Sequence, residues 1–128
     1  MEKTNRAEYA AQLRSFHGCN CCQAVAVALA DETNLPAEQL KQIASGFGGG
    51  MGTMDGTCGA LVGTGIIAGL KLESKATQRY TRQIVTEFKE MSGAVVCKEL
   101  KGIGTGVMLC PCEECVKNAV RAYEKVMR

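Results

Sequence analysis

Apolar residues recur along this chain at the spacing of an α-helix, and the alternating pattern of a β-strand is nearly absent. A helix is predicted over residues 75–91, because apolar side chains separated by four, one and three positions share one helical face. These side chains are Tyr80, Ile84, Val85 and Phe88. The closing segment, residues 112–127, predicts another amphipathic helix, whose apolar face consists of Val116, Ala119, Val120, Tyr123 and Val126.

The N-terminal third of the chain also favours helices. Residues 4–31 are rich in Ala, Leu, Gln, Glu and Arg and contain no proline, but Gly18 weakens the middle. The segment therefore forms either one helix or two helices joined at residues 17–20. Residues 21–30 are almost wholly small and apolar, which is typical of a helix buried on all sides. Pro36 then suits the first position of the next helix.

That helix is expected to end near Ser45, where a glycine-rich loop over residues 46–52 begins. A third helix is expected to start near residues 55–58 and to continue to Leu70. It carries four glycines, which makes sense where another backbone packs very closely. The loop has no G-x-x-x-x-G-K-[ST] pattern and follows no predicted strand, so phosphate binding is not indicated. We interpret it as a tight backbone crossing that brings Cys58 to the other cysteines.

These patterns predict an all-α fold, a compact bundle of about five helices with the glycine-rich loop between helices 2 and 3. The 128 residues, of which 46% are hydrophobic and 22% charged, suit one globular domain over residues 1–128. Its cysteine content predicts that this domain serves redox chemistry or metal binding.

Charge and composition exclude several classes of partner. A net charge of +2 and only six aromatic residues argue against nucleic acid. The first residues are polar and charged, without the apolar stretch of a secretory signal. No apolar run approaches the roughly 20 residues of a membrane span. We therefore expect a cytoplasmic protein with no membrane partner, in a compartment where persistent disulfides are rare.

Eight cysteines are the most unusual feature of the composition. They fall into four groups along the chain: Cys19/Cys21/Cys22, Cys58, Cys97 and Cys110/Cys112/Cys115. This spacing differs from the paired C-x-x-C of a zinc ribbon and from the bacterial ferredoxin run. A site made from all four groups has to be assembled by the tertiary fold.

Three of the four groups lie at the expected starts of helices. Cys58, Cys97 and the pair Cys112 and Cys115 each stand in a predicted first helical turn. The partial positive charge of a helix N-terminus favours the thiolate over the thiol. Since the thiolate binds metals and attacks disulfides, these positions favour chemistry over core packing.

The other candidate residues have simpler interpretations. Cys22 lies one residue beyond Cys21, points elsewhere on a helix, and is expected to pack in the core. Cys19 and Cys110 are as readily bystanders as ligands. His17, the only histidine, lies four residues before Cys21, so an unbroken helix would make it a candidate ligand or proton donor. An exposed or capping role is the more typical one for His17.

Five segments together resemble a known protein family: residues 18–25, 44–52, 58–63, 97–102 and 112–119. They are similar to the G-x-N-C-A-Q opening, the glycine loop, and the C-G-A-x-x-G, C-x-x-L-x-G and C-x-x-x-V-x-x-A elements of a redox-active family. That family is named for its C–GCAxxG–C–C cysteine pattern. The resemblance spans most of the chain, and the combination is more specific than any single element.

The resemblance implies a small, mostly helical domain with four family cysteines. These correspond here to Cys21, Cys58, Cys97 and Cys112. The segment between Cys97 and Cys112 looks short, which leaves Cys110 and Cys115 as alternatives to Cys112, and Cys22 replaces the usual alanine. A relative of this domain, in split-Soret-type cytochromes, is associated with an iron–sulfur cluster.

The leading hypothesis is a protein that carries electrons through an iron–sulfur cluster or another thiolate-bound metal. Soft thiolates with a single histidine favour iron–sulfur over zinc or copper(II). The predicted metal ligands are Cys21, Cys58, Cys97, Cys112 and Cys115.

Two alternatives stay open. One is a metal-free thiol–disulfide oxidoreductase using Cys112 with Cys115, or Cys58 with Cys97. The other is a structural zinc-binding interaction module. The leading hypothesis requires an electron-transfer partner protein, and the glycine-faced segment 60–70 could pack against a second copy of the chain as a homodimer.

Overall fold

The computed structural model describes residues 5–128. Within this part of the chain the fold is all-α, as the sequence pattern predicted. Seven α-helices follow one another: α1 (Arg6–Phe16), α2 (Cys21–Ala28), α3 (Ala37–Ala44), α4 (Gly59–Leu72), α5 (Thr77–Ser92), α6 (Cys97–Lys101) and α7 (Cys112–Val126). A 3-10 turn (η2, Ala30–Glu32) and a π-type turn (η3, Gly50–Met54) complete the order.

The bundle contains more helices than the five or so expected, because the first predicted helix is divided and the short helix α6 precedes the last one. The division falls at the predicted joint. The Asn20 side chain accepts a hydrogen bond from the Gln23 amide, and the Gln23 side chain accepts one from the Asn20 amide. This capping box satisfies two amides at a helix start, so α2 begins at Cys21.

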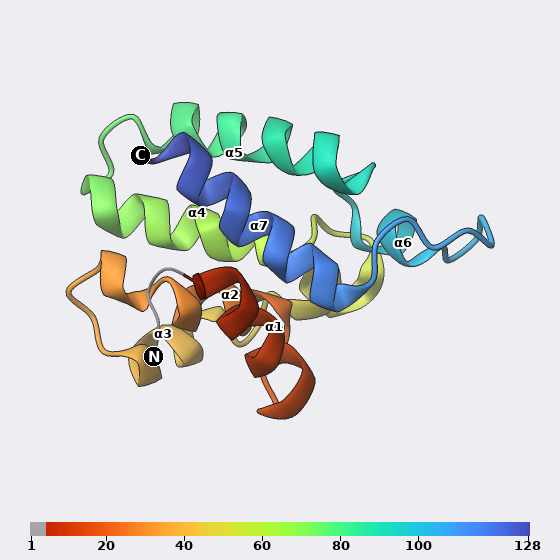
Figure 1. The fold of residues 1–128 in the computed structure, drawn as a ribbon, viewed down its shortest axis with the longest axis horizontal. Helices are drawn as coiled ribbons and strands as arrows, with labels where there is room; N and C mark the ends of the chain where they lie inside the picture. Colours follow the sequence, from red (N-terminus) through yellow and green to blue (C-terminus); the bar gives the residue numbers. More distant parts are fainter. Residues whose placement is uncertain (1–4) are drawn as a thin grey trace.

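The helices form two groups that pack against each other. Figure 1 shows α4, α5 and α7 lying side by side, with α1, α2 and α3 on the other side of α4 and α7. The helix α6 and the loop after it project from one end (Figure 1). The largest fully buried side chains of the core include Tyr123, Phe88, Leu29, Leu40 and Ile67. None of the described helices combines the length and apolar character that crossing a bilayer requires.

Glycines allow α4 to approach α2 closely, as the sequence predicted for this helix. A Cβ on Gly59 would lie 2.7 Å from the Phe47 carbonyl oxygen and 3.3 Å from the Cys22 amide nitrogen of α2, and one on Gly63 would lie 3.0 Å from the Cys22 carbonyl oxygen. Gly65 differs, because its nearest neighbour is a threonine methyl of α5 at 3.8 Å. The close approach of α2 and α4 therefore depends on the first two glycines.

A cluster of charged side chains ties α1 to α7 and to the turn after α2. The Arg6 guanidinium lies 3.0 Å from a carboxylate oxygen of Asp31, of Glu32 and of Glu124. The Tyr123 hydroxyl donates a hydrogen bond to the second Glu32 oxygen at 3.1 Å. Because the arginine side chain is only 13% exposed, its three carboxylate partners offset the loss of hydration.

Candidate redox site

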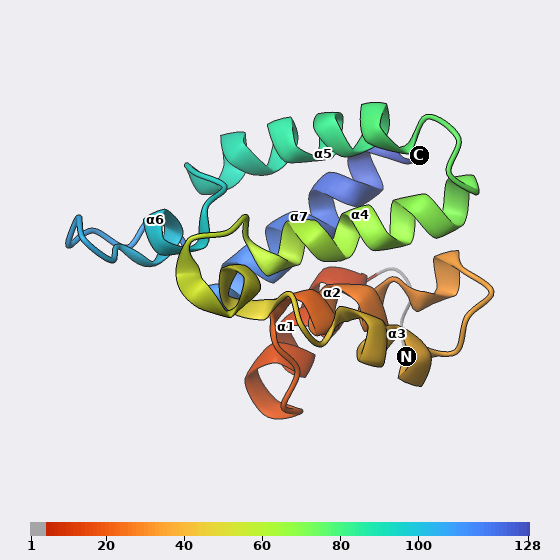
Figure 2. The same ribbon diagram turned by 180° about the vertical axis from the view of Figure 1, so that it is seen from behind.

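A cavity of about 220 Å³ lies at the end of the bundle where several helices begin. Its lining consists of Arg14, Asn20, Cys21, Gly49, Met54, Cys58, Gly59, Cys97, Lys101 and Cys112. The structure thus brings the four cysteines of the family pattern to one cavity, although up to 39 residues separate neighbours in sequence. Figure 2 shows the glycine-rich segment passing around this end of the molecule.

All four cavity cysteines stand at helix N-termini. Cys21, Cys97 and Cys112 are the first residues of α2, α6 and α7, and Cys58 is the N-cap of α4. The sequence predicted such positions for three of the groups, and the capping by Asn20 adds Cys21 to them. The longer helices α2, α4 and α7 direct partial positive charge toward the sulfurs.

A short backbone pairing holds Cys58 next to Cys97. The Cys58 amide donates a hydrogen bond to the Val95 carbonyl at 2.7 Å, and the Cys97 amide donates one to the Gly56 carbonyl at 2.9 Å. The residues that directly precede the two cysteines, Thr57 and Val96, form an antiparallel β-bridge. Main-chain hydrogen bonds alone therefore hold two cysteines that are 39 positions apart in the sequence next to each other.

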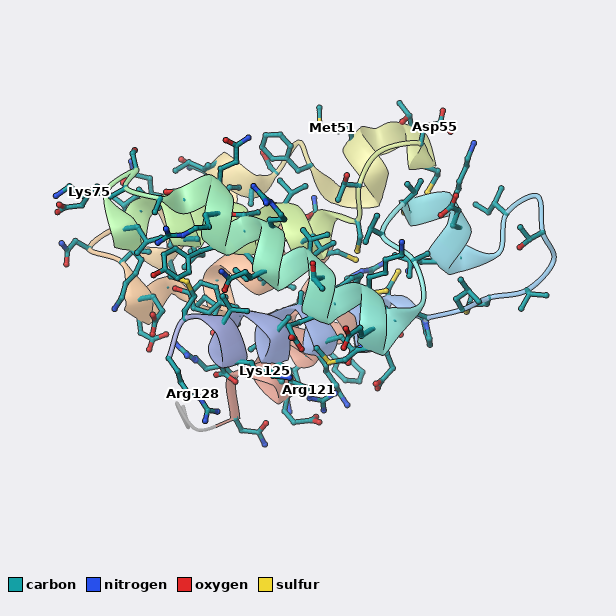
Figure 3. All side chains as sticks on the ribbon, turned by 90° about the horizontal axis from the view of Figure 1, so that it is seen from above. Met51, Asp55, Lys75, Arg121, Lys125 and Arg128 are labelled. Atoms are coloured by element: carbon teal, nitrogen blue, oxygen red, sulfur yellow. The ribbon has the colours of Figure 1, made fainter. Side chains whose placement is uncertain are left out.

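The glycine-rich segment closes over this pairing, in agreement with its interpretation as a backbone crossing. Gly50 has a positive φ of 61°, and a Cβ there would lie 2.9 Å from the Cys97 Cβ. The Asn20 side-chain amide donates to the Ser45 carbonyl at 3.1 Å, which joins the start of α2 to the same segment. In Figure 3, the turn carrying Met51 and Asp55 stands at the same end of the molecule as α6.

Two cations reach the sulfurs. The Arg14 guanidinium, in the last turn of α1, lies 3.5 Å from the Cys112 sulfur. The Lys101 ammonium, at the end of α6, lies 3.6 Å from the Cys115 sulfur and donates to the Cys110 carbonyl at 3.2 Å. Sequence spacing gave no signal for Arg14, since it precedes the first cysteine group and belongs to another helix.

The ionisation of Cys112 is linked to that of Cys21. The hydrogen bond from Cys21 holds the pKa of the Cys112 thiol well below its ordinary value, and the charges of Lys101 and Arg14 lower it further. The same hydrogen bond, together with burial, raises the pKa of Cys21. Cys112 is also the only described cysteine that is partly exposed, so it is the most accessible thiolate of the site.

Cys58 and Cys115 form a second pair. The hydrogen bond from Cys115 lowers the pKa of the Cys58 thiol, and the backbone amide of Ala60 contributes in the same direction. The pKa of Cys115 is raised by this hydrogen bond and by burial. Cys115 is fully buried and is absent from the cavity lining, so it lies behind Cys58 rather than beside the cavity.

Cys97 has a different neighbour, the thioether of Met54. The two sulfurs are 3.7 Å apart, and burial raises the pKa of the Cys97 thiol. Met54 has a positive φ of 69°, an uncommon conformation for a residue with a side chain, and it lines the cavity. Met54, two residues beyond the glycine-rich segment, thus places its thioether sulfur against the Cys97 sulfur.

The remaining candidates lie outside the cavity. Cys19, Cys22 and Cys110 are buried but do not line it. Cys22 packs at the contact of α2 with α4, as predicted, and burial raises its pKa to about 12. His17 is exposed and ends α1, so the helix is broken between it and Cys21 and the two do not share a face.

The cavity cysteines do not converge on a single point. Within residues 5–128, no three His, Cys, Asp or Glu side chains lie so that they could hold one metal ion. Four of the cysteines instead line one cavity. No specific cofactor follows from this geometry alone.

Cysteines gathered at helix N-termini in an all-α fold, two of them with lowered pKa, support a protein of thiolate chemistry. The chain belongs to the family described as "Putative redox-active protein (C_GCAxxG_C_C)", whose profile matches residues 19–126. The resemblance read from the sequence is thereby confirmed, and a redox role is supported. No curated protein and no solved structure matches the chain.

Proposed function

We propose that the protein is a redox carrier that binds an iron–sulfur cluster in the cysteine cavity. The observation that carries this proposal is the donor set: four cysteines from four helix N-termini line one cavity, together with a methionine. No carboxylate or imidazole belongs to that lining. Thiolates are the ligands that iron–sulfur clusters use, whereas harder metals prefer oxygen or nitrogen.

The shape of the site supports a cluster better than a single ion. One zinc ion needs its ligands about 2.3 Å from a common point, and no three described His, Cys, Asp or Glu side chains are placed to hold one ion. A cluster carries its own bridging sulfides, so its ligands stand farther apart around a larger volume. The cavity of about 220 Å³ fits that description.

We assign the ligands as Cys21, Cys58, Cys97 and Cys112. Cys115, the fifth ligand predicted from the sequence, is instead assigned a supporting role, because it hydrogen-bonds Cys58 from behind. When bound, a cluster supplies one-electron transfer. The chain supplies the ligands, excludes water from three of them by burial, and surrounds them with helix N-termini.

A second function, metal-free thiol–disulfide exchange, is favoured by the two sulfur pairs. The Cys112 thiolate would attack a disulfide of a substrate protein, forming a mixed disulfide and releasing one substrate thiol. Cys21 would then displace the second substrate thiol and form the Cys21–Cys112 disulfide. Two cysteines are oxidised and one substrate disulfide is reduced. This proposed pair differs from those of the sequence hypotheses, which joined Cys112 with Cys115 or Cys58 with Cys97.

The experiment that separates these functions is anaerobic purification followed by visible absorption and by iron, sulfide and zinc analysis. Iron and acid-labile sulfide together, with absorption that bleaches on reduction, are expected. Iron-free protein after anaerobic reconstitution, with a reversible Cys21–Cys112 disulfide found by peptide mapping, would contradict the cluster and favour thiol exchange. Zinc at one equivalent without iron would favour the structural module.

The proposal includes a partner protein that exchanges electrons with the site, in the cytoplasm. A homodimer through residues 60–70 stays a prediction. Part of that glycine face already contacts α5 within the chain, since the Gly65 and Gly69 positions each lie 3.8 Å from a threonine methyl there. Sedimentation of the purified protein would establish whether the exposed remainder joins two copies.

A further inference from the structure

The two cations at the cysteine cavity have no carboxylate partner among residues 5–128. Every ion pair found there involves other basic residues: Arg6, Lys71, Lys98, Lys117 and Lys125. Arg14 and Lys101 contact sulfur atoms and one carbonyl oxygen instead. The Arg14 Nε is buried and has no hydrogen-bond partner in the described structure.

Two partly buried cations without carboxylate partners are unfavourable unless a negatively charged group lies nearby. A cation that loses part of its hydration needs a compensating charge or a full set of hydrogen bonds. The carbonyl oxygen of Cys110 supplies a single acceptor for Lys101, and nothing comparable serves the Arg14 Nε. One carboxylate, that of Glu113, lies within electrostatic range of both cations, but it accepts a hydrogen bond from Ser15 and forms no ion pair with either cation. The ionisable groups that the two cations contact directly are the sulfurs at the cavity end.

We propose that Arg14 and Lys101 are charge-compensating residues of the redox centre, and that together they set its reduction potential. This inference rests on the proposed function. Four thiolates around a dipositive iron–sulfur core leave two negative charges, which the two cations balance. Arg14 approaches from α1 on the side of Cys112, and Lys101 approaches from α6 on the side of Cys115.

The electrical consequence follows from the sign of the charges. Reduction adds one electron to a centre that is already negative, and nearby positive charge stabilises the reduced form more than the oxidised form. Removal of either cation should therefore lower the reduction potential. Removal of both cations should lower the potential further than either single removal, and the two effects should be coupled because both cations act on Cys112.

The test is a dye-mediated redox titration of the iron-loaded protein and its variants. Arg14→Gln and Lys101→Gln should each shift the one-electron reduction equilibrium at least tenfold toward the oxidised form, which corresponds to ~59 mV. Arg14→Lys should restore most of the potential. Arg82→Gln, at an exposed position of α5, is the control and should leave it unchanged. Unchanged potentials in both glutamine variants, with normal iron content, would overturn the inference.

A second measurement needs no cluster. In iron-free protein, the rate of Cys112 alkylation by anionic iodoacetate is divided by the rate with neutral iodoacetamide, so that the thiolate fraction cancels. This ratio should fall at least threefold in Arg14→Gln and in Lys101→Gln, and a ratio unchanged in both overturns the inference. If the wild-type protein binds no iron but the ratio still falls in both variants, the iron–sulfur cluster is contradicted and the charge-compensating role of the two cations is not. Arg14→Met and Lys101→Met, which keep the aliphatic stem, replace any glutamine variant that is unfolded by circular dichroism.

Discussion

Arg6 and Arg14 stand at opposite ends of α1, and their surroundings differ in kind. Arg6 is held by carboxylates of Asp31, Glu32 and Glu124, each at 3.0 Å. Arg14 reaches a cysteine sulfur at 3.5 Å, and its Nε has no described partner. The first cation completes a closed cluster of ion pairs, and the second faces a cavity.

The difference separates a structural region from a reactive one. The Arg6 cluster contains its own counter-charges, so its energy does not depend on a ligand. The cysteine end carries cations, helix N-termini and thiols without carboxylates in the cavity lining, so its charge depends on which sulfurs ionise and on what they bind. The two regions should therefore respond differently to substitution.

The largest effect is expected at the cysteine end, from Cys58→Ser. Loss of this ligand should abolish stable iron binding and lower the Tm of the loaded protein to that of the iron-free protein, because metal binding is coupled to folding. Iron per chain and calorimetry measure both. Cys19→Ser is the matched control, since Cys19 is buried but does not line the cavity. Equal iron loss in both variants would contradict the assigned site.

The next largest effect is expected at the Arg6 cluster. Arg6→Met leaves three carboxylates together without their cation and should destabilise the fold by about 3 kcal/mol, measured by urea unfolding. The labelling and redox properties of the cysteines should be unchanged. Lys125→Met, which breaks an exposed ion pair with Glu87, is the control and should leave the urea midpoint nearly unchanged. A similar loss in both would show that the Arg6 cluster is not special.

The pH dependence of stability sharpens the same contrast. Burial alone would raise the pKa of Glu32, but hydrogen bonds from Arg6 and Tyr123 outweigh it and the pKa is lowered. The stabilisation is thus complete above the ordinary carboxyl pKa and is lost as the pH falls through the lowered value. Urea unfolding between pH 7 and pH 3 should show this loss in the wild type and a weaker one in Arg6→Met.

A smaller effect is expected where α4 meets α2. Gly59→Ala places a Cβ against the Phe47 carbonyl and should destabilise the protein by about 2 kcal/mol, while moving Cys58 away from the other cysteines. Gly65→Ala, whose Cβ has ordinary contacts, should be neutral or slightly stabilising. Urea unfolding together with iron content checks both. If Gly65→Ala lowered stability and iron content more than Gly59→Ala, the position of Cys58 would not depend on the close packing at Gly59.

The smallest perturbation is a change of pH during thiol labelling of the iron-free protein. At pH 6 an ordinary cysteine is less than about 1% thiolate. Cys112 should still react with iodoacetamide, because its pKa is lowered by the bond from Cys21 and by nearby cations, and because it is partly exposed. Peptide mapping after brief exposure should find Cys112 modified first. Equal labelling in urea is the control, and earlier modification of Cys97 would contradict the described environment.

Much of the helical framework is readable from the sequence because its signals are local. The spacing of apolar residues predicts a helix over 112–127, and the structure has one over Cys112–Val126. The start of α2 is indicated by Asn20 three residues before Gln23, since these two residues form the capping box. The same local signals place Cys58 and Cys97 at helix starts, where the structure has them.

The sulfur pairs were not readable in this way. Cys21 and Cys112 are 91 residues apart, and Cys58 and Cys115 are 57 apart. Spacing within one helix specifies the face on which a side chain lies, but not which other helix that face meets. The C-x-x-C pair Cys112 and Cys115 was one hypothesis for a dithiol. In the structure a distant cysteine makes the largest contribution to the pKa shift of each: Cys21 for Cys112, and Cys58 for Cys115.

The cations show the same division most clearly. Arg14 is an ordinary basic residue in the last turn of a helix, a position that by itself predicts only a favourable interaction with the helix dipole. It acquires a role because α1 packs against α7, which brings it to Cys112, 98 positions away. Backbone propensity and helix capping depend on residues that are close in sequence, so the sequence alone reveals them. Burial and charge compensation depend on which surfaces meet, and those meetings exist only once the helices have packed.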